Sequence, residues 1–268
     1  MLGSVPLFMA IPSDRRRWVS PTGNNLGDQS VNKIICENCL EVLPTLPPAT
    51  MIWADPPDNL GLKYDGFTDK RPDYIQWLTG GVIRTALQHE PGVFWLSPYY
   101  RYLPNILGWF YSWRSDSPKE WQVRLFLWRF TFGQHQTKDC GNGYRPILRF
   151  SKPGFKWNTD AIRVPSARQS KYQDLRADPR GRVPDDVFEF PRICGTFKER
   201  RRYCPNQHPK ALMRRIIAMS CSPGDSVIDL FAGTGSCVRA CEELGIDCTS
   251  IDISPNYCQH LREELRCK

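Results

Sequence analysis

One stretch of the sequence combines acidic residues and glycines in a pattern typical of a nucleoside-binding loop. Within residues 227–236 (VIDLFAGTGS), an apolar run ends at Asp229, and Gly233 and Gly235 lead into a helical pattern. Glycines at these positions permit a tight turn and let a ligand approach the backbone closely. About twenty residues later, Asp252 ends the next expected strand, where a carboxylate can accept hydrogen bonds from both ribose hydroxyls. This downstream acid argues against a simple glycine-rich turn, and the missing third glycine favours S-adenosylmethionine over a pyrophosphate cofactor.

A second stretch, residues 51–59 (MIWADPPDN), places an acid and two prolines at the end of another apolar run. Tandem prolines fix the backbone and cannot donate hydrogen bonds, so the carbonyls there are held rigidly. The Asp55 carboxylate and the Pro56 carbonyl can therefore orient an amino group toward a methyl sulfonium and take up its positive charge. This pattern predicts methyl transfer to an exocyclic amine, which needs positioning more than a strong base. An ordinary turn at the end of a strand is the alternative interpretation.

The positive charge of the chain is concentrated in one segment. The net charge is +8, and residues 151–215 alone hold sixteen Lys or Arg against seven Asp or Glu. Aromatic residues lie among these cations, namely Tyr172, Phe188, Phe190 and Tyr203. A solvated charged loop is the alternative, but the length and the interleaved rings favour a surface that meets phosphates and stacks on bases.

Composition also bears on membranes, compartment and metals. No eighteen-residue window is continuously apolar, and the basic run Arg15–Arg17 follows the first apolar stretch, which is the wrong order for a signal peptide. We therefore expect a soluble, cytoplasmic protein with no membrane partner. Eleven cysteines, an odd number in a chain of 268 residues, favour free thiols. No metal is predicted, because neither candidate group has the four ligands of a structural zinc site: Cys36 with Cys39, and Cys194 with Cys204 and His208.

Short apolar runs alternate with helical patterns from residue 32 onward. Strands are expected over residues 33–36, 50–54, 92–97, 226–230 and 247–252, and helices over 73–90, 210–219 and 235–244. Ser254 and Pro255 are a typical opening for a last helix. Residues 121–132 and 145–152 predict an antiparallel hairpin at the sheet edge, joined around Gly141-Asn142-Gly143. The fold class is therefore α/β with a mixed, mostly parallel sheet. Together with the nucleoside-binding loop and the Asp-Pro-Pro motif, we expect a Rossmann-like S-adenosylmethionine-dependent methyltransferase fold.

Four segments follow from this organisation. Residues 1–31 lack periodicity and are expected to form a poorly ordered N-terminal arm. Residues 32–154 form the catalytic half of the methyltransferase domain, and residues 204–268 form the cofactor-binding half. Between them, residues 155–203 lose regular patterning and form a long basic insertion, which a compact domain carries only for a purpose.

Taken together, these motifs resemble the β class of amino-group DNA methyltransferases, in which an Asp-Pro-Pro-aromatic motif precedes the cofactor loop. The resemblance runs from residue 32 to the C-terminus. Residues 39–43 (CLEVL) resemble the turn and helix after the first strand, and residues 144–152 resemble the hairpin strand that ends in Phe-Ser-Lys. Residues 204–212 (CPNQHPKAL) resemble a helix opening that helps to hold the methionine end of the cofactor.

The resemblance implies a role for each matching residue. The catalytic residues would be Asp55, Pro56, Pro57 and Asp58. The cofactor-binding residues would be Asn38, Asp55, Asn206, Gln207, Asp229, Phe231, Gly233, Gly235, Ser236 and Asp252. The insertion would be the target-recognition region, with Arg163, Arg168, Lys171, Arg200, Arg201 and Arg202 on DNA.

The implied function is S-adenosylmethionine-dependent methylation of adenine's amino group in double-stranded DNA, as in restriction-modification, with the base flipped out beside Asp55. Asp at the first motif position resembles the adenine-specific members, and cytosine-N4 methylation is the alternative. We consider a homodimer as the assembly. Two further readings are a catalytically impaired, cofactor-binding DNA-binding protein and a methyltransferase of structured RNA.

Three positions depart from the family pattern. Asp58 stands where an aromatic ring normally stacks on the flipped base, and such a ring contributes about 1–3 kcal/mol per base. Tyr64 or Phe67 could supply the missing ring. Cys204 replaces the usual His of the helix opening, and Glu37-Asn38 replaces the usual Gly-Asp, which leaves the contact to the cofactor's adenine to Asn38.

Overall fold

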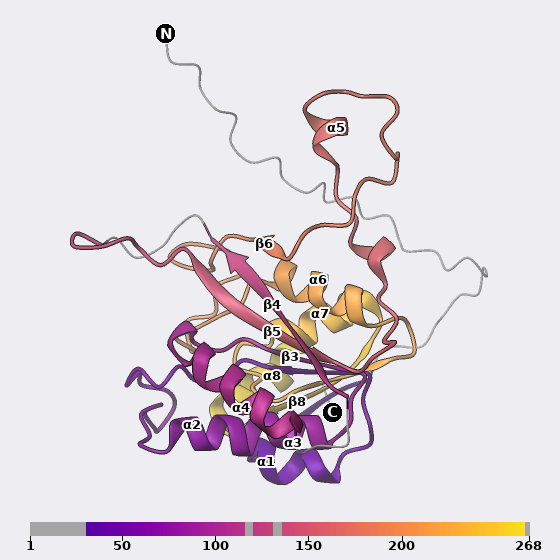
Figure 1. Ribbon diagram of the computed structural model, residues 1–268. Coiled ribbons are helices and arrows are strands. Elements are labelled where there is room, and N and C mark those ends of the chain that lie inside the picture. Colours follow the sequence, from indigo (N-terminus) through magenta and orange to yellow (C-terminus); the bar gives the residue numbers. More distant parts are fainter. Residues whose placement is uncertain (1–30, 116–119, 131–135, 266–268) are drawn as a thin grey trace.

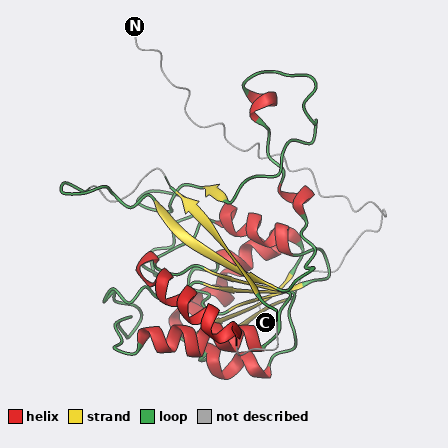
Figure 2. Ribbon diagram, in the orientation of Figure 1, coloured by secondary structure: helices red, strands yellow, loops and turns green. Residues whose placement is uncertain are grey.

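The computed structural model describes residues 31–115, 120–130 and 136–265. The expected N-terminal arm lies outside these residues, except for Val31, as do the last residues of the strand expected over 121–132. Within the described part, an eight-stranded sheet has helices on both faces (Figures 1 and 2).

The sheet order is β1-β8-β7-β2-β3-β5-β4-β6. Its strands are β1 (Asn32–Cys36), β2 (Met51–Ala54), β3 (Val93–Leu96), β4 (Gln122–Arg129), β5 (Tyr144–Ser151), β6 (Val187–Glu189), β7 (Ser226–Asp229) and β8 (Asp247–Asp252). The first five strands in this order are mutually parallel, while β5 runs antiparallel to both β3 and β4. The predicted α/β fold with a mostly parallel sheet is confirmed. The predicted hairpin lies at one end of the sheet, and the short strand β6 extends that end by pairing with β4.

The central strands are buried on both faces because helices cover each of them. In β2, Met51 and Trp53 pack on the side of α6 (Lys210–Ser220) and α7 (Ser236–Leu244). The alternate residues Ile52 and Ala54 face the opposite layer. That layer contains α1 (Cys39–Val42), η1 (Leu43–Thr45), α2 (Tyr74–Gln76), η2 (Trp77–Ile83), α3 (Arg84–Gln88), η3 (Tyr100–Tyr102) and α4 (Leu103–Ser115). Parallel strands of this kind read as continuous apolar runs, which is why the sequence located them.

Helix boundaries agree with the sequence in most places. The helix expected over 73–90 is one helical segment, with the π-helical turn η2 between α2 and α3. The last helix, α8 (Pro255–Leu265), opens as expected, because the Ser254 hydroxyl accepts a hydrogen bond from the Tyr257 backbone N–H at 3.1 Å. Helix α4 was not expected, since Pro104 and a tyrosine-rich start obscure its pattern.

The basic insertion contains a lobe, residues 165–181, that projects from the sheet at the top of Figure 1. It follows η4 (Thr159–Ile162) and carries the short helix α5 (Ala167–Ser170). The neck of the lobe is closed by Val164 and Arg182, whose backbones exchange hydrogen bonds of 2.9 and 2.8 Å. Gly181 has φ +84°, and a Cβ there would meet the Val164 carbonyl oxygen at 2.3 Å, so the neck requires glycine.

Candidate active site

The carboxyl ends of the parallel strands meet at one edge of the sheet and carry the predicted acids. Asp55 follows β2, Asp229 ends β7 and Asp252 ends β8. Ligands bind at this edge in open α/β sheets. A cavity of about 450 Å³ lies there, a volume typical of small-molecule sites. Its walls include nearly all the predicted catalytic and cofactor residues: Asn38, Asp55, Pro56, Pro57, Asp58, Asn206, Gln207, Asp229, Phe231, Gly233, Ser236 and Asp252.

Gly235 is the one predicted cofactor residue that does not line this cavity. It lies at the start of α7 with φ +75°, and a Cβ there would approach Leu261 Cδ2 to 2.4 Å. The structure thus places Gly235 against α8, where it allows the turn and the close packing of two helices.

The two acids of the cofactor half differ in their surroundings. Asp252 accepts hydrogen bonds from the backbone N–H groups of Gly233 (2.8 Å) and Ser254 (2.9 Å), one on each carboxylate oxygen. Asp229 is almost fully buried, and burial raises its pKa well above the ordinary range despite a hydrogen bond from the Phe231 N–H. Asp252 is thus held in place to accept a hydrogen bond from a ligand. Asp229 would become charged when a cationic group of a ligand lies beside it.

These groups fit S-adenosylmethionine. The Asp252 carboxylate offers about four acceptor sites, more than its backbone donors occupy, which suits a ribose hydroxyl. Asp229 could accept a hydrogen bond from the ammonium group of the methionine moiety. Phe231 and Trp77, whose rings lie edge to face at 6.0 Å, form an aromatic wall that could hold the adenine. Asn38 caps α1 by accepting the Leu40 N–H at 3.1 Å, so its side chain is fixed at the mouth of the same cavity.

The helix opening before α6 is tied to the rest of the site. Ser236 donates its hydroxyl hydrogen to the His208 carbonyl at 2.7 Å, which joins α7 to this opening. Gln207 is held by two backbone groups, accepting from the Arg201 N–H and donating to the Glu199 carbonyl, each at 2.8 Å. Asn206 is exposed and donates to the Tyr64 hydroxyl at 3.4 Å.

Asp55 is bound by two side chains that the sequence did not single out as site residues. Arg145 Nη2 lies 2.9 Å from Asp55 Oδ1, and His208 Nδ1 lies 2.9 Å from Asp55 Oδ2. Burial alone would raise the pKa of Asp55, but the charges and hydrogen bonds of His208 and Arg145 outweigh it, so the pKa lies below its ordinary value. Asp55 is therefore an ionised acceptor at neutral pH.

Asp58 is paired rather than isolated. Its two oxygens accept from Arg145 Nη2 (2.8 Å) and Nη1 (3.0 Å) in a bidentate contact, and its residue is only 6% exposed. Arg145 therefore neutralises one of the two motif carboxylates. Burial disfavours the guanidinium charge, but Asp58 and Asp55 together raise the pKa of Arg145 above its ordinary value.

Comparison with known proteins agrees with this geometry. A model of the DNA methylase family (N6_N4_Mtase) matches residues 49–263. The chain belongs to this family. It is 30% identical over 249 residues to the type II methyltransferase M.HpaI of Haemophilus parainfluenzae, covering 87% of this chain and 74% of that protein. It is 28% identical to the DNA adenine methyltransferase YhdJ of Escherichia coli strain K12, covering 84% of this chain and 79% of that one.

Solved structures share the fold. The M1.HpyAVI–SAM complex has a TM-score of 0.60 at 18% identity, covering 88% of this chain and 99% of that chain. The cytosine-N4-specific PvuII DNA methyltransferase has a TM-score of 0.62 at 14% identity, covering 86% and 84%. This DNA methylase is thus an S-adenosylmethionine-dependent enzyme that acts on DNA, as its sequence predicted.

The residues that the sequence missed in this methylase are Arg145, His208 and Ser97. Ser97 follows β3, is fully buried, and its Oγ lies 2.8 Å from Arg145 Nε and 3.0 Å from His208 Nε2. Arg145 was part of the matched hairpin strand, and His208 was part of the matched helix opening. The sequence could have indicated Arg145 and His208, because both are polar residues within matched motifs. Their contact with Asp55 could not be predicted, because it depends on the order β2-β3-β5 in the sheet.

The loop after the Asp-Pro-Pro motif carries the two rings proposed as substitutes for the missing aromatic. Its fold depends on Asp69, which is buried and accepts from the N–H groups of Leu60, Gly61 and Leu62. Tyr64 and Phe67 stack on each other at 5.6 Å and both line the cavity. Burial, then the charges of Asp55 and Asp58, raise the pKa of Tyr64, so its phenol stays neutral.

The predicted DNA-contacting residues differ in their availability. Arg168, Lys171 and Arg202 are exposed, and Arg168 Nε lies 3.4 Å from Asp174 Oδ2. Arg163, by contrast, bonds Asp160 and the Gly181 carbonyl at the neck of the lobe, at 2.6 and 2.8 Å. Arg201 pairs with Glu264, and Arg200 donates to the Pro205 carbonyl. In this structure these three arginines hold the methylase's own loops.

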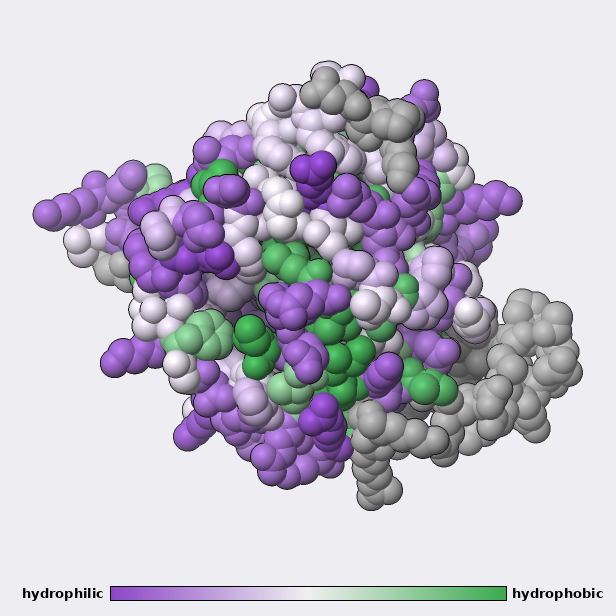
Figure 3. Space-filling view, turned by 90° about the horizontal axis from the view of Figure 1, so that it is seen from below, coloured by the Kyte–Doolittle hydropathy of each residue, from purple (hydrophilic) through white to green (hydrophobic). Residues whose placement is uncertain are grey.

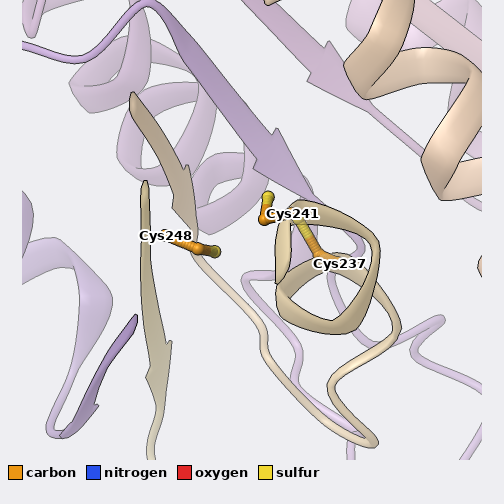
Figure 4. Close-up of side chains that lie close together, drawn as sticks. All are labelled: Cys237, Cys241 and Cys248. Carbon is orange, nitrogen blue, oxygen red and sulfur yellow. The ribbon is translucent and has the colours of Figure 1, made fainter. Parts of the chain in front are cut away.

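Among the described residues, one group of side chains approaches metal-site spacing. The thiols of Cys237, Cys241 and Cys248 lie within 4.8 Å of one another between α7 and β8 (Figure 4). They form part of the apolar core, and no fourth ligand in the described part of the chain joins the group, so it falls short of a structural zinc site. The metal candidates named from the sequence do not form such a group.

No helix in the described ranges is long and apolar enough to cross a membrane.

Proposed function

We propose that this methylase transfers the methyl group to the exocyclic N6 amino group of adenine, with the target base flipped out of double-stranded DNA. One observation carries this proposal: Asp55 and the two prolines form a wall of the same cavity that Asp229, Gly233 and Asp252 line. An amino group bound at Asp55 would therefore lie next to the methyl donor. The name of YhdJ, an adenine methyltransferase at 28% identity, supports the choice of base.

The reaction depends on acceptors that are already in place. Bound S-adenosylmethionine supplies an electrophilic methyl group on a sulfonium centre. The ionised Asp55 carboxylate accepts an N–H of the amine, which directs the nitrogen lone pair toward the methyl carbon and stabilises the charge that develops on nitrogen. Pro56 is buried, and the following carbonyl of Pro57 is held by the Tyr74 hydroxyl at 2.6 Å, so the motif backbone is rigid.

The pairing of Asp58 with Arg145 supports an active rather than an impaired enzyme. A lone carboxylate would repel the electron-rich edge of a base, but the bidentate contact removes that charge from the pocket. We assign the base-stacking role to Tyr64, whose half-buried side chain lines the same cavity as Asp55. Exposed Arg168 and Lys171 of the lobe are the proposed phosphate contacts, while Arg163, Arg200 and Arg201 would act by shaping the loops.

Cytosine-N4 methylation is the second candidate, because cytosine presents the same kind of exocyclic amine and the PvuII enzyme, named as cytosine-N4-specific, shares this fold. The two candidates predict different products from the same assay.

The test is incubation with tritium-labelled S-adenosylmethionine and unmethylated duplex DNA of mixed sequence, followed by nucleoside analysis. We expect label in N6-methyldeoxyadenosine, whereas label in N4-methyldeoxycytidine would establish the second candidate. Asp55→Ala should abolish transfer while cofactor affinity stays within about tenfold, since Asp55 positions the amine. Absence of label in DNA with both wild type and variant, despite cofactor binding, would refute the enzymatic proposal.

A further inference from the structure

Four side chains from four segments form a closed hydrogen-bond ring around the catalytic acid. Arg145 Nε donates to Ser97 Oγ (2.8 Å), Ser97 Oγ contacts His208 Nε2 (3.0 Å), His208 Nδ1 contacts Asp55 Oδ2 (2.9 Å), and Arg145 Nη2 donates to Asp55 Oδ1 (2.9 Å). We propose that His208 is a positioning residue whose protonation state sets how well Asp55 accepts the target amino group. This inference rests on the proposed function of Asp55.

The ring assigns the tautomer of neutral His208. His208 Nδ1 lies 2.9 Å from an oxygen of the ionised Asp55 carboxylate, so Nδ1 must carry a hydrogen, and Nε2 is then the acceptor for the Ser97 hydroxyl hydrogen. The imidazole proton then lies on Nδ1 and is donated to Asp55 Oδ2. Every donor and acceptor of the ring is satisfied in this state, and the orientation of the Asp55 carboxylate is fixed at both oxygens.

Protonation of His208 would reorganise the ring. Nε2 then carries a hydrogen and donates to Ser97 Oγ, so the Ser97 hydroxyl must turn to another acceptor. The Asp55 carboxylate offers one, because the Ser97 side chain is close enough to it to lower the pKa of Asp55. Asp55 then receives Arg145, His208 and Ser97 and stands beside two cations, which leaves it a poorer acceptor for the target N–H.

The surroundings of His208 make Asp55 its main charged partner. Arg145 from β5 and Asp58, which Arg145 neutralises, are the next charged groups on the cavity side. The Trp128 ring of β4 lies 5.0 Å from the imidazole, and the Trp53 ring of β2 lies edge-on at 5.5 Å. From the helix opening itself comes the Cys204 thiol, whose pKa burial raises to about 11, so it is neutral. The imidazole thus contacts one carboxylate directly and packs against two tryptophan rings.

The chemical step explains why the protonation state of His208 affects the rate of methyl transfer. The amino nitrogen forms a bond to the methyl carbon while the methyl–sulfur bond breaks and its electron pair stays on sulfur. The nitrogen then loses one N–H proton, which passes to water at the mouth of the cavity. During this step Asp55 must accept a hydrogen bond from the N–H of the amine. When His208 is protonated, the Ser97 hydroxyl and the imidazolium charge compete with that hydrogen bond.

The experiment is a pH series of single-turnover methyl transfer at saturating cofactor and DNA, from about pH 5.5 to about pH 8.5, the range in which histidines ordinarily change charge. Wild type should lose rate as the pH falls. His208→Asn keeps a donor at the Nδ1 position but cannot ionise, so we expect a rate within about tenfold of wild type at high pH and no low-pH loss. His208→Gln places its amide toward Ser97 instead, and should be slower than His208→Asn at every pH by about tenfold or more.

His89→Asn is the matched control, because His89 contacts the Pro47 carbonyl away from the cavity. Its pH profile should match that of wild type. A His208→Asn enzyme that keeps the wild-type low-pH loss overturns the inference, as does equal behaviour of the Asn and Gln variants.

A second readout does not depend on activity. In ¹⁵N-histidine spectra of the cofactor-bound protein, the signal missing from His208→Asn identifies His208. At high pH we expect the Nδ1–H tautomer, and an Nε2–H tautomer would refute the ring. Should wild type fail to methylate DNA, the function proposed above is wrong, and the spectrum alone decides whether the ring exists.

Discussion

At the scale of single residues, the departure of Asp58 from the family pattern is explained by its partner. An unpaired carboxylate in a base pocket would be costly, but Asp58 and Arg145 make a bidentate contact with both side chains largely buried. The sequence showed the acid and raised the question of activity. It could not show the answer, because Arg145 lies 87 residues away and reaches Asp58 only through the pairing of β3 with β5.

Asp229 makes a prediction about stability and pH. Burial raises its pKa in the folded protein above its value of about 3.9 in unfolded chains. Between these two pKa values the folded state holds one more proton than the unfolded state, so this residue lowers the free energy of unfolding as pH rises. Asp229→Asn removes the effect. The variant should be more stable than wild type at about pH 8 and similar at about pH 4, and denaturant unfolding at both pH values measures this.

The same variant should bind S-adenosylmethionine more weakly, by about tenfold or more, because it loses a charge-assisted contact. Calorimetric titration checks the affinity. Lower stability at pH 8 than wild type would show that Asp229 is ionised and stabilised in the folded protein, contrary to the argument from burial.

At the scale of elements, the sequence predicted the strands that the site depends on. The runs that end at Asp55 and Asp229 were recognisable because β2 and β7 are short and buried, with an acid where each run stops being apolar, whereas β8 (DCTSID), which ends at Asp252, alternates buried and more exposed residues. Strand order was not predictable in the same way. The ring around Asp55 joins the ends of β2 and β3 to the start of β5, and only the antiparallel pairing of β5 brings Arg145 to that edge.

The two glycines at the ends of α7 allow a matched test of helix packing. Gly235 at its start and Gly245 after its end both have left-handed backbones, with φ of +75° and +66°. A Cβ at Gly235 would meet Leu261 Cδ2 at 2.4 Å and Val238 Cγ1 at 3.2 Å, whereas a Cβ at Gly245 meets nothing within 4 Å. Both Ala variants share a backbone cost of about 1–2 kcal/mol.

Gly235→Ala should lose a further 1 kcal/mol or so of unfolding free energy through overpacking. Urea unfolding of the two variants measures the difference. Equal losses would mean that Leu261 moves aside freely and that α7 and α8 are less tightly packed than the structure shows.

At the scale of the whole molecule, the lobe proposed to meet DNA projects from the sheet, and none of its residues 165–181 lines the cavity at the sheet edge. The helical layer of α1, α2 and α3 forms the lower side in Figure 1, and seen from below its centre is apolar and its rim hydrophilic (Figure 3). The projecting lobe is at the opposite end. Several of the arginines that the sequence concentrates in residues 151–215 pair with acids of the same segment, as in Arg176–Asp174 and Arg180–Asp178.

Because residues 165–181 lie outside the lining of the cavity, we expect that the lobe can be removed without loss of the fold. Val164 and Arg182 form an antiparallel pair that exchanges both hydrogen bonds, which is the pair that a two-residue turn closes. Replacing residues 165–181 with Asn-Gly should keep cooperative unfolding and leave cofactor affinity within about threefold. DNA binding should weaken, and the slope of log affinity against log salt should fall by about two, because the segment holds four Lys or Arg against two Asp.

The variant Arg168→Gln with Lys171→Gln is the control that keeps the lobe and removes two exposed charges. It should reproduce the change in salt slope, while the target site is still methylated in preference to other sequences. The lobe-deleted enzyme should lose that preference, since phosphate contacts position the protein whereas base contacts specify the site. Unchanged DNA binding after deletion would exclude the lobe as a DNA surface, and loss of cofactor binding would make it part of the methyltransferase core.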